Sequence, residues 1–265
     1  MSVNMEQLAH LEWVNYAASR SIIEQTPGLD LCIRDDVVLT SSSVFPAPDT
    51  THACCLWADE QTVEKLLDEV IDYFQSRNLP PTIYLSPACT PYDLPARLKR
   101  RGFKPQIGQE AWLVLENLAD FTIPPALPGF RVEPVTAATV STFTRLFLSA
   151  FELPVELTPQ LAGLLEPSVG LPGVYHYLGW ADEEPIGTSS LISYQDYGIL
   201  GSVSVLSPHR RNGAGTNLVV EALWQARADG VNTILLQTTA NTFLEQILCL
   251  AGFRRAFIRT AYILS

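Results

Sequence analysis

Two stretches of this 265-residue chain, about 150 residues apart, follow the same order of features. Each has an amphipathic segment, a β-branched segment (TIYLSP from Thr82, TILLQT from Thr233), a short helix-like segment and a Gly-Phe pair. The pairs are Gly102-Phe103 and Gly252-Phe253. An order that recurs at a nearly constant spacing indicates a repeated fold. The sequence therefore predicts two copies of one α/β fold with a mixed sheet.

A proline-rich segment separates the two stretches. Residues 120–129 read DFTIPPALPG, and three prolines with a glycine interrupt any helix or central strand. We expect a degenerate copy of the fold in residues 1–120, a linker at 121–128 and the complete copy in 129–265. Because 47% of the residues are apolar, both parts have enough apolar side chains for a packed core.

Hydrophobic spacing predicts the secondary structure of both parts. In the second part, the turns 182–185 and 195–198 join three strands into an antiparallel meander, and a pair of strands is expected after Phe253. Helices are predicted at 5–23, 60–76, 94–101, 139–151, 158–165, 215–228 and 243–250. Strands are predicted at 31–39, 52–57, 82–86, 104–107, 111–115, 130–135, 174–180, 186–193, 199–205 and 233–237.

Charge and cysteine usage limit the possible partners and surroundings. A net charge of −11 argues against a nucleic-acid partner, because neutralising phosphates needs clustered Lys and Arg. The chain lacks a run of about 18 apolar residues and begins with polar and acidic residues, so we expect a cytoplasmic protein without a membrane partner. The five cysteines are scattered without C-x-x-C spacing, which predicts neither a disulfide framework nor a metal site.

The segment 202–220, SVSVLSPHRRNGAGTNLVV, carries the clearest functional signal. Glycines between a strand and a helix let backbone N–H groups approach a ligand, and the helix N-terminus favours an anion such as a pyrophosphate. Arg210 and Arg211 could add charge-assisted contacts. A Walker loop is excluded because no lysine follows Lys104, and a dinucleotide fingerprint is excluded because Leu218 replaces its third glycine. The remaining pattern is R-x-x-G-x-G, from Arg210 to Gly215.

This motif and its surroundings resemble the GNAT acyltransferase superfamily over residues 129–265. The meander, the loop, the helix, TILLQT, Asn241 and Gly252-Phe253 occur in the order typical of that family. The resemblance implies a sheet split between its fourth and fifth strands, acetyl-CoA as cosubstrate and no metal. It implies that the pantetheine arm pairs with Val203, Ser204 and Val205, and that Asn241 contacts the coenzyme. It places the pyrophosphate on Arg210, Arg211, Asn212, Gly213, Ala214, Gly215 and Thr216.

The implied activity is transfer of an acetyl group to an amine of a small molecule or peptide. Two departures leave its acid and base open: Leu248 occupies the position of a tyrosine common in the family, and residues 199–205 contain no carboxylate. The candidates are Tyr262, Asp196 and Glu152, with a packed strand aromatic and solvated loop charges as the alternatives. A non-catalytic acyl-CoA sensor or assembly module, and a plain nucleotide-phosphate binder, therefore stay open.

The remaining histidines and the first part are expected to serve structure. His176 lies in an apolar strand, where a satisfied sheet residue is expected. His209 is a possible base, but beside the loop we expect it to form a local hydrogen bond or to face water. In the first part, the segment equivalent to the loop is Trp57–Gln61, which has no glycine and two acids, so we expect no coenzyme there. The basic run 97–101 is interpreted as the last turn of a helix. The acceptor amine stays unidentified, and both a monomer and a homodimer are compatible with the sequence.

Overall fold

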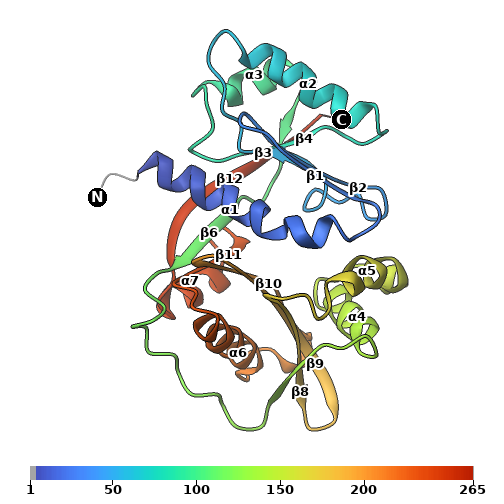
Figure 1. Ribbon diagram of the computed structural model, residues 1–265, viewed down its shortest axis with the longest axis vertical. Coiled ribbons are helices and arrows are strands. Elements are labelled where there is room, and N and C mark those ends of the chain that lie inside the picture. Colours follow the sequence, from blue (N-terminus) through green and yellow to red (C-terminus); the bar gives the residue numbers. More distant parts are fainter. Residues whose placement is uncertain (1–3, 265) are drawn as a thin grey trace. The chain divides into compact units, whose positions relative to one another are not determined.

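The computed structural model describes residues 4–264, which form two compact units (Figure 1). Unit 1 contains residues 4–24, 28–113 and 237–264, and unit 2 contains residues 25–27 and 114–236. This division differs from the expected one near residues 120–129, because the C-terminal segment packs with the first part of the chain. Its strand β12 (Arg254–Ile263) pairs with β4 (Thr82–Leu85) through four registered residue pairs.

Unit 1 is built on a mixed sheet in the order β1-β2-β3-β4-β12. β3 and β4 are parallel, and the other neighbours in this order are antiparallel. The short β5 also pairs with β12. Its remaining strands are β1 (Leu29–Ile33), β2 (Val38–Ser42), β3 (His52–Cys54) and β5 (Lys104–Pro105), and β6 (Glu110–Leu115) crosses into unit 2 after Leu113. Its helices are α1 (Met5–Ile23), α2 (Val63–Gln75), α3 (Leu94–Arg100) and α7 (Phe243–Leu250).

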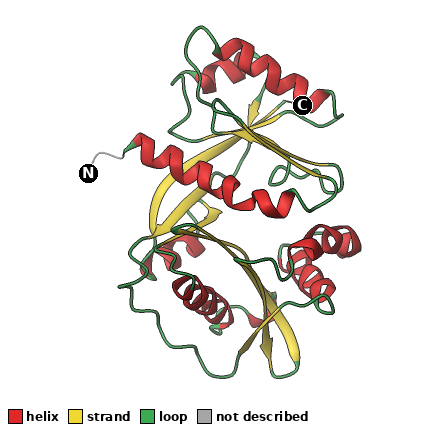
Figure 2. Ribbon diagram, viewed as in Figure 1, coloured by secondary structure: helices red, strands yellow, loops and turns green. Residues whose placement is uncertain are grey.

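Helices cover both faces of the sheet in unit 1 (Figures 1 and 2). α2 and α3 bury Leu67, Phe74 and Leu98 against one face, as their amphipathic spacing predicts. α1 places Tyr16 in a second cluster with Val38 and Tyr84. The sheet therefore has a core on each side.

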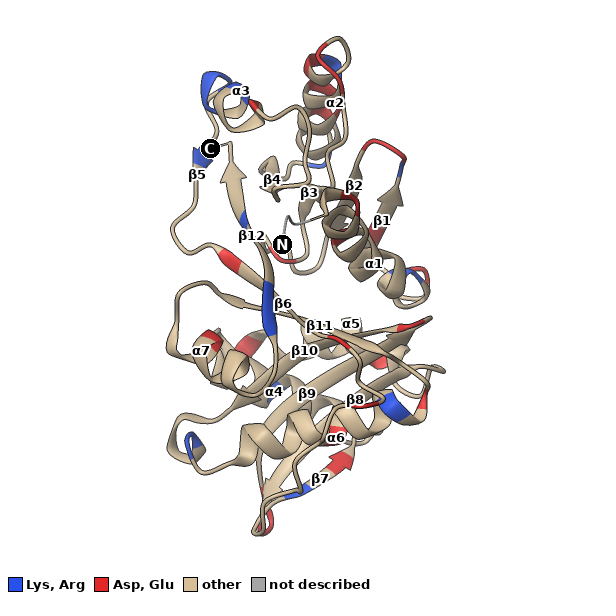
Figure 3. Ribbon diagram, turned by 90° about the vertical axis from the view of Figure 1, so that its left-hand side faces the viewer, with Lys and Arg blue, Asp and Glu red and all other residues tan. Residues whose placement is uncertain are grey.

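Ion pairs join α2 to α3, and Figure 3 colours acidic residues red on the ribbon of α2 and basic residues blue on that of α3. Arg97 contacts Glu60 and Glu64, and Arg101 contacts Glu64 and Asp68. The basic run 97–101 thus forms the last turn of α3, which confirms its structural interpretation.

Unit 2 has an antiparallel meander, β7-β8-β9-β10, followed by β11 parallel to β10. α6 packs on β8, β9 and β10, and α4 packs on β9 and β10; Figure 1 shows the two helices on opposite faces. The strands are β7 (Arg131–Pro134), β8 (Val174–Ala181), β9 (Glu184–Tyr194), β10 (Tyr197–Val205) and β11 (Thr233–Thr239), whose last residues belong to unit 1. The helices are α4 (Val140–Ala150), α5 (Thr158–Leu165) and α6 (Ala214–Ala228).

The observed elements agree with most of the predicted ones. The expected pair of strands after Phe253 is wrong, because a single ten-residue strand, β12, runs there. Its pairing partners in unit 1 lie far away in sequence, on β4 and β5, so no local turn signals the arrangement. Among residues 4–264, no helix combines the length and the apolar character that crossing a membrane requires.

Candidate functional site

The loop between β10 and α6 has the geometry of an anion site. After β10 ends at Val205, a short 3-10 turn leads into Arg210 and Arg211, and α6 begins at Ala214. Gly213 is the residue before the helix, and its φ of 93° lies in the left-handed region. Side chains rarely tolerate that conformation, so glycine is needed where the chain turns into the helix.

The first amides of α6 are free to bind a ligand. No side chain caps this helix. The structure also gives the N–H groups of Ala214, Gly215 and Thr216 no partner within residues 4–264. Three unpaired amides at the positive end of a helix dipole favour an anion.

The two arginines of the motif behave differently. The Arg210 guanidinium donates to the carbonyl of Val205 at 2.9 Å and to that of Ala150, at the end of α4, at 2.7 Å. Arg210 therefore ties the end of α4 to the end of β10 through its Nε and Nη2. The side chain of Arg211 is exposed and has no ion pair within the described residues, so it is free to meet an anion.

A residue of the proline-rich segment is fastened to the start of α6. The buried Asn217 accepts a hydrogen bond from the Leu127 N–H and donates one to the Leu127 carbonyl, both at 2.8 Å. The Leu127 side chain lies against Gly213, so a Cβ at Gly213 would overlap it. Sequence reasoning missed this clamp, because nothing in the pattern of residues 121–128 assigns them a partner.

Replacing Asn217 with alanine is expected to lower the free energy of unfolding by about 1–2 kcal/mol, because two partly buried backbone groups of Leu127 lose their partner. Urea unfolding followed by circular dichroism measures the change. Asn232 is exposed, and Asn232→Ala in the same unit should stay within about 0.5 kcal/mol of the parent. Equal effects of the two substitutions would show that the clamp contributes nothing.

The backbone of β10 loses its partner strand before it reaches the loop. Parallel pairing of β10 with β11 ends at Leu200 and Leu236, although β10 continues to Val205. The register between β10 and β9 shifts between Gly201 and Ser204, with a left-handed Ser202 at φ 53°. Such a bulge re-aims backbone groups. Val203, Ser204 and Val205 thus lie on the stretch that β11 leaves, where the resemblance places the pantetheine arm.

The two candidate acids lie at opposite ends of unit 2. Asp196 is in the turn before β10, and its carbonyl accepts the amides of Asn232 and Thr233. The nine residues of β10 put it about 30 Å from the loop. Glu152 is exposed and follows α4, two residues after the Ala150 carbonyl that Arg210 holds. Glu152 is therefore the candidate that lies at the loop end of the strand.

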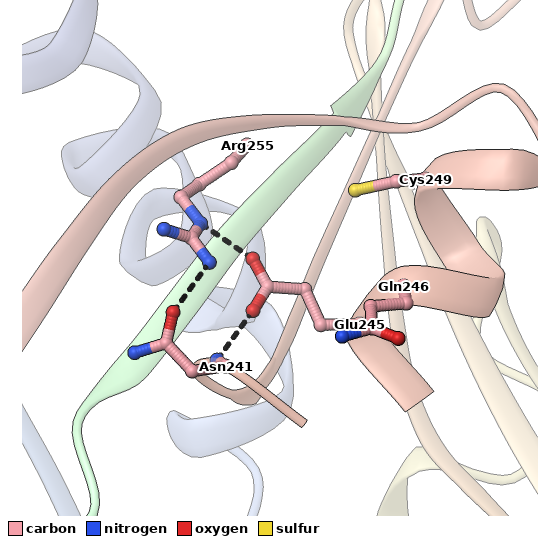
Figure 4. Close-up of a pocket in the computed structure, with 5 residues that line it drawn as sticks. All are labelled: Asn241, Glu245, Gln246, Cys249 and Arg255. Atoms are coloured by element: carbon pink, nitrogen blue, oxygen red, sulfur yellow. Dashed lines mark hydrogen bonds and ion pairs between the residues drawn. The ribbon is translucent and has the colours of Figure 1, made fainter. Parts of the chain in front are cut away.

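The other two candidate residues belong to unit 1. Tyr262 is 7% exposed and packs in the core formed by α2, α3 and the sheet, which is the expected alternative to a catalytic role. The Asn241 amide oxygen accepts from Arg255 at 3.1 Å, and its backbone N–H donates to Glu245 (Figure 4). Arg255 also binds Glu245 at 2.5 Å. The side-chain oxygen of Asn241 is thus already engaged in this structure.

Both histidines of unit 2 have local partners. His209 lies 3.6 Å from the carboxylate of Glu184. His176 is buried between the hydroxyls of Ser168 and Ser190, each at 2.8 Å. Because the Ser168 hydroxyl donates to the Leu165 carbonyl, it accepts from the Nε2 of His176, and the Nδ1 accepts from Ser190. The expectation of a satisfied sheet histidine is confirmed.

Burial lowers the pKa of His176 to about 4 from an ordinary value of 6.5. Between these values the unfolded chain binds the proton and the folded one does not, so stability present above pH 6.5 is lost as the pH falls toward 4. A His176→Gln variant lacks this titration. Its deficit relative to the parent should therefore shrink by about 2 kcal/mol between pH 7 and pH 5, as measured by urea unfolding. A constant deficit would contradict the buried neutral imidazole.

In unit 1, the backbone of the segment after β3 is hydrogen-bonded to other residues of the unit, whereas the first amides of α6 in unit 2 are unpaired among the described residues. Thr90 donates its N–H to the Leu56 carbonyl at 2.9 Å, and its hydroxyl bonds with the backbone of Ala58. The Asp59 carboxylate accepts the amides of Gln61 and Thr62 before α2. The hydrogen bonds from Thr62 lower the pKa of Asp59. A paired backbone and an anionic side chain before α2 disfavour a pyrophosphate there.

The family comparison agrees with this geometry. The model of the acetyltransferase (GNAT) family matches residues 141–247, which include α4, β8 to β11 and the loop. This segment, which is less than half of the chain, is therefore similar to the GNAT acetyltransferase family. A search of curated protein sequences finds no significant match.

Solved structures show that the fold of the GNAT family extends over nearly the whole chain. A GCN5-related N-acetyltransferase from Kribbella flavida is similar at a TM-score of 0.70 and 16% identity, over 94% of each chain. One from Sphaerobacter thermophilus has a TM-score of 0.64 at 14% identity, over 92% of this chain and 84% of that one. A tandem GNAT protein from the clavulanic acid biosynthesis pathway has a TM-score of 0.60 at 14% identity, over 100% and 97%. The predicted mixed α/β fold is confirmed.

Proposed function

We propose that this chain transfers an acetyl group from acetyl-CoA to an amine of a small molecule or peptide, with the coenzyme held by unit 2. The observation that carries the proposal is the set of three unpaired amides at the start of α6, next to a β10 edge that β11 has left. A pyrophosphate and an extended amide-bearing arm are complementary to these two features. We further propose that residues 1–120 and 129–265 are two copies of the fold, and that the first binds no coenzyme.

Residues of unit 2 are suited to bind the pyrophosphate and the pantetheine arm of the coenzyme. Ala214, Gly215 and Thr216 would hold the pyrophosphate through their amides, with Arg211 adding charge. Val203 to Val205 would bind the pantetheine arm, and an N–H of this bulged stretch would polarise the acyl carbonyl. Bound acetyl-CoA supplies the activated acyl group.

Glu152 is the base that we propose for the acceptor amine. It would take a proton from the amine, which needs a free electron pair to attack the thioester carbonyl. Its place after α4 brings it to the loop end of β10, whereas Asp196 lies at the other end. With Leu248 in place of the family's tyrosine, solvent would return the proton to the leaving thiolate.

Release of free thiol tests the activity. Acetyl-CoA would be incubated with a panel of amines that includes amino acids, polyamines, aminoglycosides and peptide N-termini, with a thiol reagent as readout. Glu152→Gln should lower kcat at least about tenfold while the affinity for acetyl-CoA stays unchanged. Glu166→Gln, an exposed carboxyl later in the same unit, should leave kcat unchanged.

The lack of a general acid at the position of Leu248 favours a second function. Leu248 has no ionisable group and Tyr262 is packed in unit 1, so a non-catalytic acyl-CoA sensor or assembly module would keep the same loop. Calorimetric binding of acetyl-CoA together with no thiol release across the whole panel would support the sensor. If the coenzyme does not bind at all, both functions fail. Competition by ATP equal to that by coenzyme A would instead indicate a plain nucleotide-phosphate site.

A further inference from the structure

Unit 2 contains a cavity that the acyl-transfer reaction does not use. It has a volume of about 470 Å³ and lies between α6 and the start of β8. A cavity of this size accommodates a small organic molecule. Its walls are Pro134 at the end of β7, Val135 directly after it, the loop before β8 and the first residues of β8. Two side chains of α6, Glu221 and Gln225, complete the lining.

Strand registers place this cavity away from the proposed transfer site. Tyr175 on β8 is paired with Leu191 on β9, and Leu191 is paired with Leu200 on β10. The stretch proposed to polarise the acyl carbonyl begins at Val203, three residues further along β10, which corresponds to about 10 Å along the strand. Two strand spacings across the sheet add to this separation. The cavity is therefore a separate site.

Two parallel tyrosine rings line the cavity. Tyr175 and Tyr177 project from the same face of β8, with ring centroids 6.4 Å apart and planes inclined by 9°. The Tyr175 hydroxyl donates to Asp229 at 3.0 Å. Tyr177 is only 3% exposed, yet its hydroxyl has no hydrogen-bond partner within residues 4–264. The hydroxyl oxygen itself is not fully buried, so it can bond with water or with a ligand in the cavity.

The cavity is also negatively charged. Glu221 lines it and forms no ion pair within the part of the chain that the structure describes, and no Lys or Arg is among the lining residues. The nearby Asp229 carboxylate accepts only from neutral donors, namely Tyr175, Ser193 and Gln225. Burial and then the charge of Glu221 raise the pKa of Tyr177, so its hydroxyl stays protonated.

We propose that this cavity binds a small organic cation, an ammonium group carried on an apolar or aromatic body. The ammonium pairs with the Glu221 carboxylate and lies near the tyrosine rings, whose faces attract a cation. The Tyr177 hydroxyl accepts a hydrogen bond from the ammonium. The apolar body packs on Val169, Leu171 and Val174. A neutral molecule of equal shape lacks the first interaction, and an anion is repelled.

Three probes of equal shape test the charge preference: phenethylammonium, phenethyl alcohol and phenylacetate. Titration followed by the amide NMR signals of unit 2 should show binding of phenethylammonium, at least fivefold weaker binding of the alcohol and no binding of phenylacetate. Shifts should concentrate at Gly170 and Gly173, which border the cavity. Glu221→Gln should weaken phenethylammonium binding at least fivefold, and Tyr177→Phe two- to fivefold. Glu183→Gln, in the exposed turn after β8, should leave it unchanged.

Equal binding of amine and alcohol, or an amine affinity that Glu221→Gln leaves unchanged, would overturn the proposal. Shifts confined to residues 203–216 would do so as well, because the amine would then occupy the proposed acetyl-CoA site. A Gly213→Asp variant separates this proposal from the proposed function. It should lose acetyl-CoA binding and keep phenethylammonium binding, since the two sites share no residue.

Discussion

Replacing Arg259 with methionine is expected to lower the free energy of unfolding by about 3–5 kcal/mol, because it leaves buried carboxylates without their counter-charge. Arg259 is 3% exposed in unit 1. It donates to Glu110 at 2.5 Å and to the Tyr16 hydroxyl at 2.7 Å, and it lies 3.6 Å from Glu12. Glu12 is fully buried, and one of its oxygens has no hydrogen bond within the described residues.

Further contacts make this guanidinium hard to replace. It stacks over the rings of Tyr84 and Trp112, with centroid distances of 4.2 and 4.8 Å. Through Tyr16 it also orders His52, whose Nε2 accepts from the tyrosine hydroxyl and whose Nδ1 donates to the Pro48 carbonyl. Burial and the nearby Arg259 charge lower the pKa of His52 to about 3, so this imidazole stays neutral.

The pH dependence distinguishes lost charge from lost packing. Burial already raises the pKa of Glu12, and Arg259 opposes that shift. Without the arginine, this pKa rises further above its value in the unfolded chain, so the folded variant gains protons and stability as the pH falls. Urea unfolding of Arg259→Met should therefore show a smaller deficit at pH 5 than at pH 7.

Two comparison variants complete the test. Adding Glu12→Gln and Glu110→Gln to Arg259→Met should recover part of the loss, since no buried charge then remains unpaired. Arg34 forms ion pairs with Asp36 and Glu69 while its side chain is 38% exposed. Arg34→Met should therefore cost less than about 1 kcal/mol. Similar losses for the two arginines would contradict the argument.

Replacing Gly213 with aspartate is expected to weaken acetyl-CoA binding at least about a hundredfold. The new carboxylate would stand beside the free amides of α6 and repel the pyrophosphate. The residue is also in the left-handed region, and its Cβ would overlap Leu127. Both effects act on the loop that the proposed function needs. Isothermal titration with acetyl-CoA measures the affinity.

The matched control for this substitution is Gly230→Asp. Gly230 has a φ of 79° after the other end of α6, and no atom lies within 4 Å of the position of its Cβ. The control should keep the affinity of the parent within about threefold, although both variants place aspartate at a left-handed glycine. Circular dichroism confirms that both variants fold. Unchanged affinity in a folded Gly213→Asp variant would remove the loop from the coenzyme site.

Local patterns were sufficient to predict most elements and the loop. The strand before Pro208, the glycine at 213 and the amphipathic helix after it are neighbours in sequence, so their preferences determine the strand-to-helix turn directly. The amide site follows from the same residues. The absence of glycine at 57–61 likewise predicted that this segment lacks a phosphate-binding loop. In the structure, Thr90 pairs with the backbone of Leu56 and Ala58.

The roles of individual side chains depended on distant partners. Arg210 could be placed in the motif by sequence, but only the fold brings Ala150, 60 residues away, to its guanidinium. Residue type makes Tyr262 and Asp196 candidates for acid–base catalysis. Strand pairing places Tyr262 in a core of unit 1 and Asp196 at the end of β10 far from the loop. The network around Arg259 joins Tyr16, 243 residues away, and no spacing rule connects such residues.

By itself, the sequence determined the class of fold and the strand-to-helix loop at residues 206–213, because both depend on neighbouring residues whose conformational preferences are local. The tertiary structure alone decided that the C-terminal strand packs with the first part of the chain, that Leu127 is clamped at the loop by Asn217, and that Glu221 and Tyr177 border one cavity. These arrangements result from long-range packing, in which burial and hydrogen-bond pairing select partners that are not adjacent in sequence.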